Sequence, residues 1–324
     1  MKKILILFLI VCYSQQTWSQ DEVNFEFSDG INNPALKQRM ERQMSMLLTA
    51  INKAESSGGM INFNGIEIDP VASQSITAHW EIAHFRCLDD DIVEHCLSLK
   101  RNGRVYGYQI RNIAVEMKPM DDSYKDDPNQ EVCINFDTKG VISDFNFTMG
   151  ITQYTRLMKE GAEIGDIDER EQVIHFCEQF KNAYIKKDIS FMENIFSDDA
   201  LIITGKVIMR KKAEVQMSQK DYEYTSKTKA EYLKGLKALF NNPKVGAINV
   251  NFKDYRIKRH GSKPNYYGVT LIQDWSHNTY SDQGIVFLVW DFTDKEMPKI
   301  QVRTWQPLET DEDEIFTLKR FKLR

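Results

Sequence analysis

The sequence lacks the short motifs that mark cofactor chemistry. It contains no glycine-rich phosphate-binding loop, no Gly-x-Ser-x-Gly nucleophile elbow and no Cys-His nucleophile arrangement. The first half contains residues of the types that bind zinc, and these are His79, His84, Cys87, His95 and Cys96. Their spacing matches no zinc-site signature. An acidic loop contains Asp121, Asp122, Asp126 and Asp127. It lacks the glycine and the distal glutamate of a calcium-binding loop. We therefore predict neither a metal nor a cofactor.

Apolar runs long enough to cross a bilayer are also missing. The one apolar run near the start, residues 4–12, follows two lysines and is too short for a membrane span. Thr17 and Ser19 then offer small residues at the positions that a signal peptidase reads. We expect a signal peptide over residues 1–19 and export to the periplasm or the medium. Bulky residues before Cys12 make a lipoprotein the less favoured alternative.

An excess of basic residues is missing as well. The formal net charge is −5, and removal of Lys2 and Lys3 with the signal peptide makes it −7. No basic stripe offsets this charge, so we expect no binding to nucleic acid or to an anionic lipid surface. The remaining length of about 305 residues suits two domains of ordinary size.

Cysteines are few, and four remain after processing: Cys87, Cys96, Cys133 and Cys177. Export permits a disulfide, for which Cys87 and Cys96 are the nearest pair. Buried free thiols are the alternative, because Cys177 lies on the apolar stripe of a predicted helix.

The stretch from residue 169 to residue 205 predicts two helices and a strand. The first helix has one apolar stripe, made of Val173, Phe176, Cys177, Phe180, Ala183 and Tyr184. Its solvent side is expected to carry Glu171, Glu178, Lys181 and Lys186. A capping box of Ser190 and Glu193 is expected to begin the second helix. The run from Ala200 to Thr204 predicts a buried strand that ends at Gly205.

This stretch resembles the nuclear transport factor 2-like (NTF2-like) superfamily, also called SnoaL-like. The residues that carry the resemblance are Phe180, Ala183, Asp188, Ile195, Phe196, Asp199 and Ala200, and the match extends to about Pro307. The resemblance implies a cone-shaped α+β fold, in which helices pack on a curved antiparallel sheet. The family includes isomerases, dehydratases, cyclases and domains that only bind, so its fold does not identify a reaction.

The rest of the second half continues the same order. Thr228 and Glu231 form a capping box that opens a helix, which ends near Pro243. Four strands are then predicted as an antiparallel meander, at residues 247–260, 266–276, 284–292 and 299–306.

The first half repeats the order of helices followed by a meander. Helices are predicted over residues 34–55 and after Pro70, and the later strands at residues 92–99, 104–117, 131–137 and 141–149. We therefore predict an α+β fold with two tandem NTF2-like cones. The expected domains are residues 30–150 and 169–308, with a linker at 151–168 and a tail at 309–324.

Two functions remain open. The favoured one is a non-catalytic exported protein whose cones bind a partner protein or a small apolar ligand, and the candidate ligand-binding residues are Tyr184, Tyr255, Tyr267, Trp275, Trp290 and Trp305. These aromatics also suit a plain core. The alternative, implied by the resemblance, is an isomerase, dehydratase or hydrolase that uses Asp274 and His277 at the mouth of the second cone. Asp274 could instead form a turn at the end of its strand.

The predicted strand at residues 284–292 is apolar on both faces. Both faces must then be covered, because an exposed apolar patch of this size is unusual in a soluble monomer. We expect the first domain to cover the far face, with a homodimer as the alternative.

Overall fold

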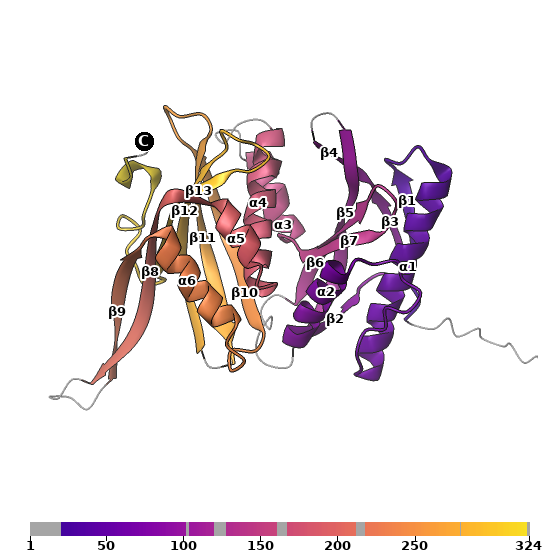
Figure 1. Ribbon diagram of the computed structural model, residues 1–324, viewed down its shortest axis with the longest axis horizontal. Helices are drawn as coiled ribbons and strands as arrows, with labels where there is room; N and C mark the ends of the chain where they lie inside the picture. Colours follow the sequence, from indigo (N-terminus) through magenta and orange to yellow (C-terminus); the bar gives the residue numbers. More distant parts are fainter. Residues whose placement is uncertain are drawn as a thin grey trace, which may run out of the picture.

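The computed structural model describes residues 21–101, 104–119, 128–160, 167–211, 218–278 and 280–322. Each half of this mixed α/β chain has its own antiparallel sheet and its own buried core (Figure 1). The predicted signal peptide, the acidic loop at residues 121–127 and part of the predicted linker lie outside the described residues. No helix in the described ranges is long and apolar enough to cross a membrane.

The first half packs two helices against a curved sheet. Its elements are β1 (Asn24–Asp29), α1 (Pro34–Ser57), α2 (Pro70–Ile82), β2 (Ala83–Cys87), β3 (Asp91–His95), β4 (Leu97–Arg101), β5 (Arg104–Pro119), β6 (Asn129–Asp137) and β7 (Ile142–Phe147). The main sheet has the order β2-β5-β6-β7, with β4 also paired to β5, while β1 and β3 form a separate parallel pair. The turn at residues 138–140, between the predicted strands at 131–137 and 141–149, joins β6 to β7, and Gly140 supplies its positive φ of 83°.

The second half is a six-stranded sheet with helices on its concave face. Its elements are α3 (Ile151–Glu160), α4 (Ile167–Ile185), α5 (Ile189–Ile195), β8 (Phe196–Lys211), β9 (Ser218–Lys227), α6 (Lys229–Phe240), β10 (Ile248–Arg259), β11 (Tyr266–His277), β12 (Tyr280–Asp291) and β13 (Lys299–Pro307). The strand order is β10-β11-β12-β13-β8-β9, and β13 pairs with β8 in parallel. The predicted meander is therefore present.

The two halves share an order of elements but differ in how the strands pair. In the second half, the strand after the second helix, β8, runs parallel to the last strand, β13. In the first half the corresponding strand, β2, pairs antiparallel with β5. The structure thus contains curved antiparallel sheets packed with helices in both halves, whereas the predicted duplication is not confirmed.

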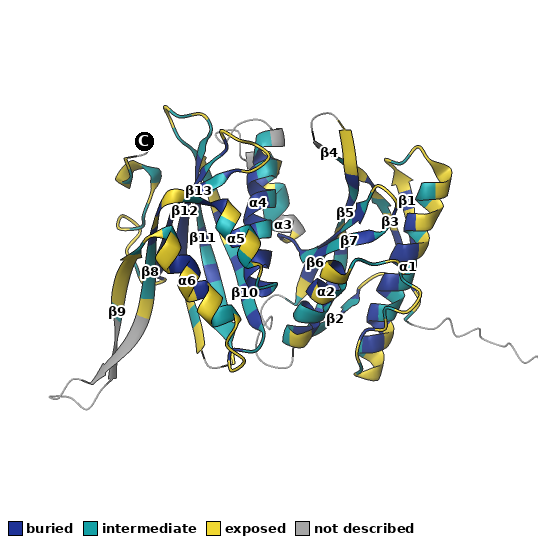
Figure 2. Cartoon of the chain, viewed as in Figure 1, coloured by how far each residue is buried: buried dark blue, intermediate teal, exposed yellow. Residues whose placement is uncertain are grey.

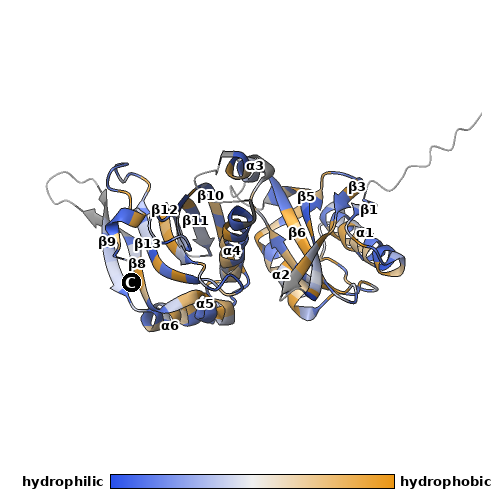
Figure 3. Ribbon diagram, turned by 90° about the horizontal axis from the view of Figure 1, so that it is seen from above, coloured by the Kyte–Doolittle hydropathy of each residue, from blue (hydrophilic) through white to orange (hydrophobic). Residues whose placement is uncertain are grey.

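Helix α4 lies between the two halves, and this position corrects the prediction for its polar side. Seen from above, the helix is placed between β10 and the sheet of the first half (Figure 3). Glu178 and Lys181 were expected in solvent, yet each is only 4% exposed. The helix has a buried face on each side because the first half covers its polar side. The periodicity of one helix cannot reveal such a cover.

Two predicted boundaries, the start of the second helix and the end of the strand after it, were also wrong. Helix α5 begins with Asp188, whose carboxylate accepts from the backbone N–H of Phe191 at 2.9 Å, and not with Ser190. Strand β8 does not end at Gly205 but continues to Lys211. By contrast, the capping box of Thr228 and Glu231 is confirmed in full.

The far face of the second sheet is covered by the C-terminal segment, here defined as residues 308–322. Phe287, Val289 and Val302 are buried on that face, and Phe316, Leu318 and Phe321 pack against them. Gln306 holds the segment, because its amide donates to the carbonyl of Glu314 at 3.1 Å and accepts from Phe316 N at 2.9 Å. A cover was needed, as predicted, but the expectation that the first domain supplies it was wrong. Figure 2 shows the exposed outer side of this segment.

The four cysteines of the described chain are buried and free. The predicted alternative of buried thiols therefore describes this structure, and Cys87 and Cys96 do not form a disulfide. Burial raises the pKa of Cys87 and of Cys96 to about 12, so neither thiol is reactive at neutral pH.

Candidate functional site at the mouth of the second sheet

A pocket of about 320 Å³ opens between α6 and the concave face of the second sheet. It is lined by Thr204 and Gly205 of β8, Lys227 of β9, Tyr232, Leu236 and Leu239 of α6, Gln273, Trp275 and His277 of β11, Tyr280 and Asp282 of β12, and Arg303 and Trp305 of β13. The apolar side chains of α6 form one wall, and the polar side chains of the strands form the other. Such a combination is typical of small-molecule sites.

Arg303 is the charged group deepest in this pocket. It lies in the middle of β13 and is only 5% exposed. Its guanidinium lies 5.5 Å from the centre of the Tyr232 ring, and its Nη2 reaches the side-chain oxygen of Gln273 at 3.4 Å. The hydroxyls of Tyr184 and Tyr232 are joined by a hydrogen bond of 2.6 Å beside it. Aromatic rings and an amide therefore surround a buried positive charge.

No carboxylate of the described residues forms an ion pair with Arg303, and its Nε has no hydrogen-bond partner. Burying a charge without a paired charge is costly, and proteins normally avoid it. Trp305 Nε1 and one oxygen of Asp282 are also buried without partners. Unsatisfied buried groups of this kind require an explanation, and a bound molecule is one.

Asp282 and His277 lie together at the rim of the pocket. Tyr280 donates its hydroxyl to Asp282 Oδ2 at 2.6 Å, while Oδ1 is unpartnered. Burial raises the pKa of Asp282, although the hydrogen bond from Tyr280 and the charges of Arg303 and His277 oppose the rise. Burial lowers the pKa of His277, and Asp282 opposes that shift. The two shifts bring the pKa values of Asp282 and His277 closer to each other than those of two exposed groups, which eases proton transfer between them.

Asp274 does not line the pocket, although the sequence suggested it as the partner of His277. Side chains alternate along β11, so that Gln273, Trp275 and His277 share the concave face. Asp274 points to the other face, where it pairs with Lys253 at 2.8 Å and accepts from Gln283. The aspartate on the same side as His277 is Asp282, which is opposite Trp275 in the next strand.

Of the six candidate aromatic residues, Trp275 and Trp305 line the pocket. Tyr184 lies just behind it, bonded to Tyr232 and 5.1 Å from the Trp275 ring. The other three, Tyr255, Tyr267 and Trp290, are at most 2% exposed and belong to the core. Trp305 also explains Gly205, because a Cβ there would overlap the indole ring.

Arg303, Gln273, Asp282 and Tyr232 were missed by sequence reasoning. One signal was available: Arg303 and Trp305 are two residues apart on one predicted strand, so they face the same way. A charge on the inward face of a buried strand indicates function more strongly than an aspartate at the end of a strand.

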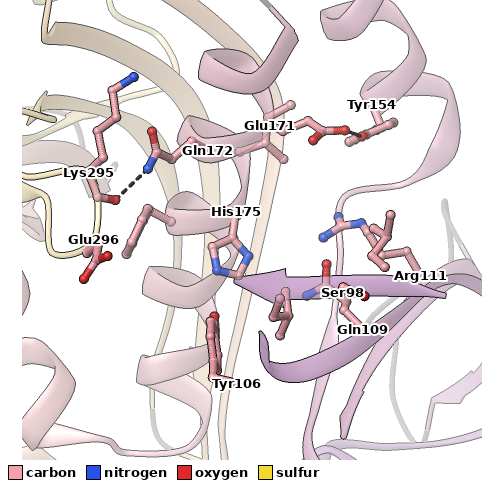
Figure 4. A pocket seen from close by; sticks show the side chains of 14 residues that line it. Ser98, Tyr106, Gln109, Arg111, Tyr154, Glu171, Gln172, His175, Lys295 and Glu296 are labelled. Carbon is pink, nitrogen blue, oxygen red and sulfur yellow. Dashed lines mark hydrogen bonds between the residues drawn. The ribbon is translucent and has the colours of Figure 1, made fainter. Parts of the chain in front are cut away.

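A second and larger pocket, of about 570 Å³, lies between the halves and is lined by both of them. Figure 4 shows Gln109 and Arg111 on one side, Lys295 and Glu296 on the other, and His175 of α4 between them. None of these residues was a sequence candidate, because the pocket arises only where the two halves meet.

No protein-family model matches the chain. No curated protein matches it either. Similar solved structures include an NTF2-like protein from Cytophaga hutchinsonii, at 17% identity over 43% of this chain and 98% of that one, with a TM-score of 0.31. Another is an NTF-2 like protein of unknown function from Shewanella oneidensis, at 12% identity over 42% of this chain and 96% of that one, with a TM-score of 0.29.

A third similar structure is Bd1075 from Bdellovibrio bacteriovorus, at 13% identity and a TM-score of 0.33. The match covers 52% of this chain and 47% of that one, so this chain spans about half the length of Bd1075. NTF2-like proteins are thus among the solved structures that the chain resembles, as the sequence indicated.

Proposed function

We propose that this protein is an exported binding protein, and that the pocket at the mouth of its second sheet holds a small organic acid. The carboxylate of the acid pairs with Arg303, and its apolar body contacts Trp275 and the leucines of α6. This proposal keeps the binding function favoured by the sequence but changes the ligand from a purely apolar molecule to one with an acidic head.

The buried guanidinium of Arg303 carries the proposal. Arginine stays protonated at any physiological pH, so burial cannot remove its charge. A planar carboxylate would accept two hydrogen bonds from the guanidinium and supply the missing negative charge. Because Asp282 Oδ1 is also unpartnered, the best ligand carries a hydrogen-bond donor, either hydroxyl or ammonium, near its carboxylate.

A binding experiment with a matched control tests this function. Calorimetric titration of the mature protein with hydroxy acids, amino acids and aromatic acids should find a ligand whose amide analogue does not bind. Arg303→Met should abolish that binding and raise the stability of the free protein, because an unpaired buried charge is removed. Arg256→Met removes an exposed arginine of β10 and should change neither. Equal binding of acid and amide would contradict the proposal.

The second candidate function is acid-base catalysis by Asp282 and His277. Their shared rim position and the raised pKa of Asp282 favour it. A screen of isomerase, dehydratase and hydrolase substrates would test it. Turnover lost in Asp282→Asn but kept in Asp274→Asn, which changes the opposite face of the sheet, would establish catalysis at this pocket. Turnover that survives both changes would place the activity elsewhere.

A further inference from the structure

The pocket between the halves differs from the first pocket in its charge. Its lining carries as many basic side chains, Arg111 and Lys295, as acidic ones, Glu171 and Glu296. Arg111 Nη2 bonds to both oxygens of Glu178 at 2.9 and 3.1 Å, and Glu171 accepts from the Tyr154 hydroxyl at 2.9 Å. Lys295 and Glu296 lie next to each other on the opposite side. The formal charges of the lining therefore sum to zero, and neither sign dominates, so the pocket favours an uncharged ligand over an ion.

The same pocket nevertheless offers hydrogen-bonding groups. Arg111 uses one nitrogen on Glu178, and no described residue accepts from its other N–H groups. His175 contacts Gln179 through Nε2 at 2.8 Å and points its other edge into the pocket (Figure 4). Burial lowers the pKa of His175, so the ring is neutral at pH 7. With Gln179 donating to Nε2, the Nδ1–H is the donor toward the pocket.

The wall contributed by the first half adds an apolar surface. Tyr106 is 52% exposed on β5, and Leu97 and Leu99 of the neighbouring strand line the pocket beside it. A half-exposed aromatic ring in the same pocket as several hydrogen-bonding side chains matches a molecule with one apolar face and a polar rim. Sugar rings have this character, since their C–H groups form one face and their hydroxyls the edge.

We propose that the pocket between the halves is a second binding site, and that its ligand is a short, uncharged oligosaccharide. One sugar ring stacks on Tyr106, and its hydroxyls bond to Arg111, His175 and Gln109. Gln109 is 6% exposed and already fixed by its bond to Asn135 at 3.1 Å, so its remaining oxygen is held in place as an acceptor. Because both halves line the pocket, binding would also hold them together.

Titration of the mature protein with three neutral tetrasaccharides, maltotetraose, cellotetraose and chitotetraose, tests the site, with tetragalacturonate as the acidic comparison. At least one neutral probe should bind more tightly than the acidic one. Tyr106→Ala should weaken that binding about tenfold or more. Tyr224→Ala removes a tyrosine of β9 with nearly the same exposure, 50%, and should leave the affinity unchanged.

Three results would overturn the proposal. They are tighter binding of the acidic probe, binding of no neutral probe at millimolar concentration, and equal loss of affinity in both tyrosine variants. The affinity of Tyr106→Ala can be compared with that of the wild type only if the two proteins have the same thermal unfolding temperature. If they do not, Gln109→Ala provides the second variant, and an unchanged affinity there would contradict the assignment. Arg303→Met should leave this binding intact, which separates it from the first pocket.

Discussion

At the scale of single residues, Glu178 joins the two halves of the molecule. Its carboxylate accepts from Arg111 of β5 and, at 2.9 Å, from the backbone N–H of Met149. Its side chain is 5% exposed and that of Arg111 is 15% exposed. Such a pair contributes little net stability over apolar residues, but removing one partner leaves the other charge buried alone.

We therefore expect Glu178→Gln to destabilise the protein by about 3 kcal/mol. Urea unfolding measures this change. Glu193→Gln removes one partner of the exposed pair between Glu193 and Lys237 and should cost at most about 1 kcal/mol. If the two substitutions had equal effects, the contact of α4 with the first half would not persist in solution.

At the scale of elements, the start of α5 offers a test of local signals. The side chain of Asp188 caps the helix, whereas Ser190 is an exposed residue of the first turn. Asp188→Ala should cost about 1 kcal/mol, and Ser190→Ala less than about 0.5 kcal/mol. Chemical denaturation distinguishes them. The reverse order would restore the capping box that the sequence suggested.

The C-terminal segment is the other element with a measurable role. Phe316 and Phe321 cover Phe287, whose ring is 5.8 Å from that of Phe321. Replacing both covering phenylalanines with alanine should destabilise the protein by about 2 kcal/mol or more, and the uncovered face should promote self-association. Light scattering and unfolding curves report both effects. Leu308→Ala, at a site 38% exposed, is the control and should remain monomeric and stable.

Local patterns predicted the elements well because short-range chemistry decides them. The box of Thr228 and Glu231, the turn at Gly140 and the meander of the second half all depend on neighbouring residues. Predictions failed where a distant segment decides the environment. Glu178 looks like a solvent residue until the first half packs on it. Asp282 and Arg303 come to line one pocket only when the strands assemble into the sheet. Gly205 looks like the end of a strand in the sequence. The structure explains the glycine differently, because a Cβ at this position would overlap the ring of Trp305, which is far along the chain.

At the scale of the whole molecule, the surface between the halves contains a buried histidine. His79 of α2 is 3% exposed, and its ring packs 4.7 Å from that of Phe147. Its Nε2 has no partner among the described residues. Burial lowers the pKa of His79 well below its ordinary 6.5, and the charges of Lys186, just after α4, and of Lys181 on α4 lower it further. Burial, aided by the two lysines of the second half, therefore keeps this ring neutral.

This arrangement predicts that acid weakens the molecule. As the pH falls below 6.5, the unfolded chain binds a proton at His79 that the folded chain does not bind, so unfolding becomes more favourable. The stabilising contribution is present above that pH, and its loss approaches about 1.4 kcal/mol per pH unit for one full proton. Urea unfolding at pH 7.5 and pH 5.5 should show the decrease.

His79→Phe fills the same space without a titrating group and should reduce the acid loss. It should not remove the loss entirely, because burial also lowers the pKa of His175 and His277. A wild-type protein equally stable at both pH values would mean that water reaches His79, and thus that the two halves separate in solution more readily than this interface implies.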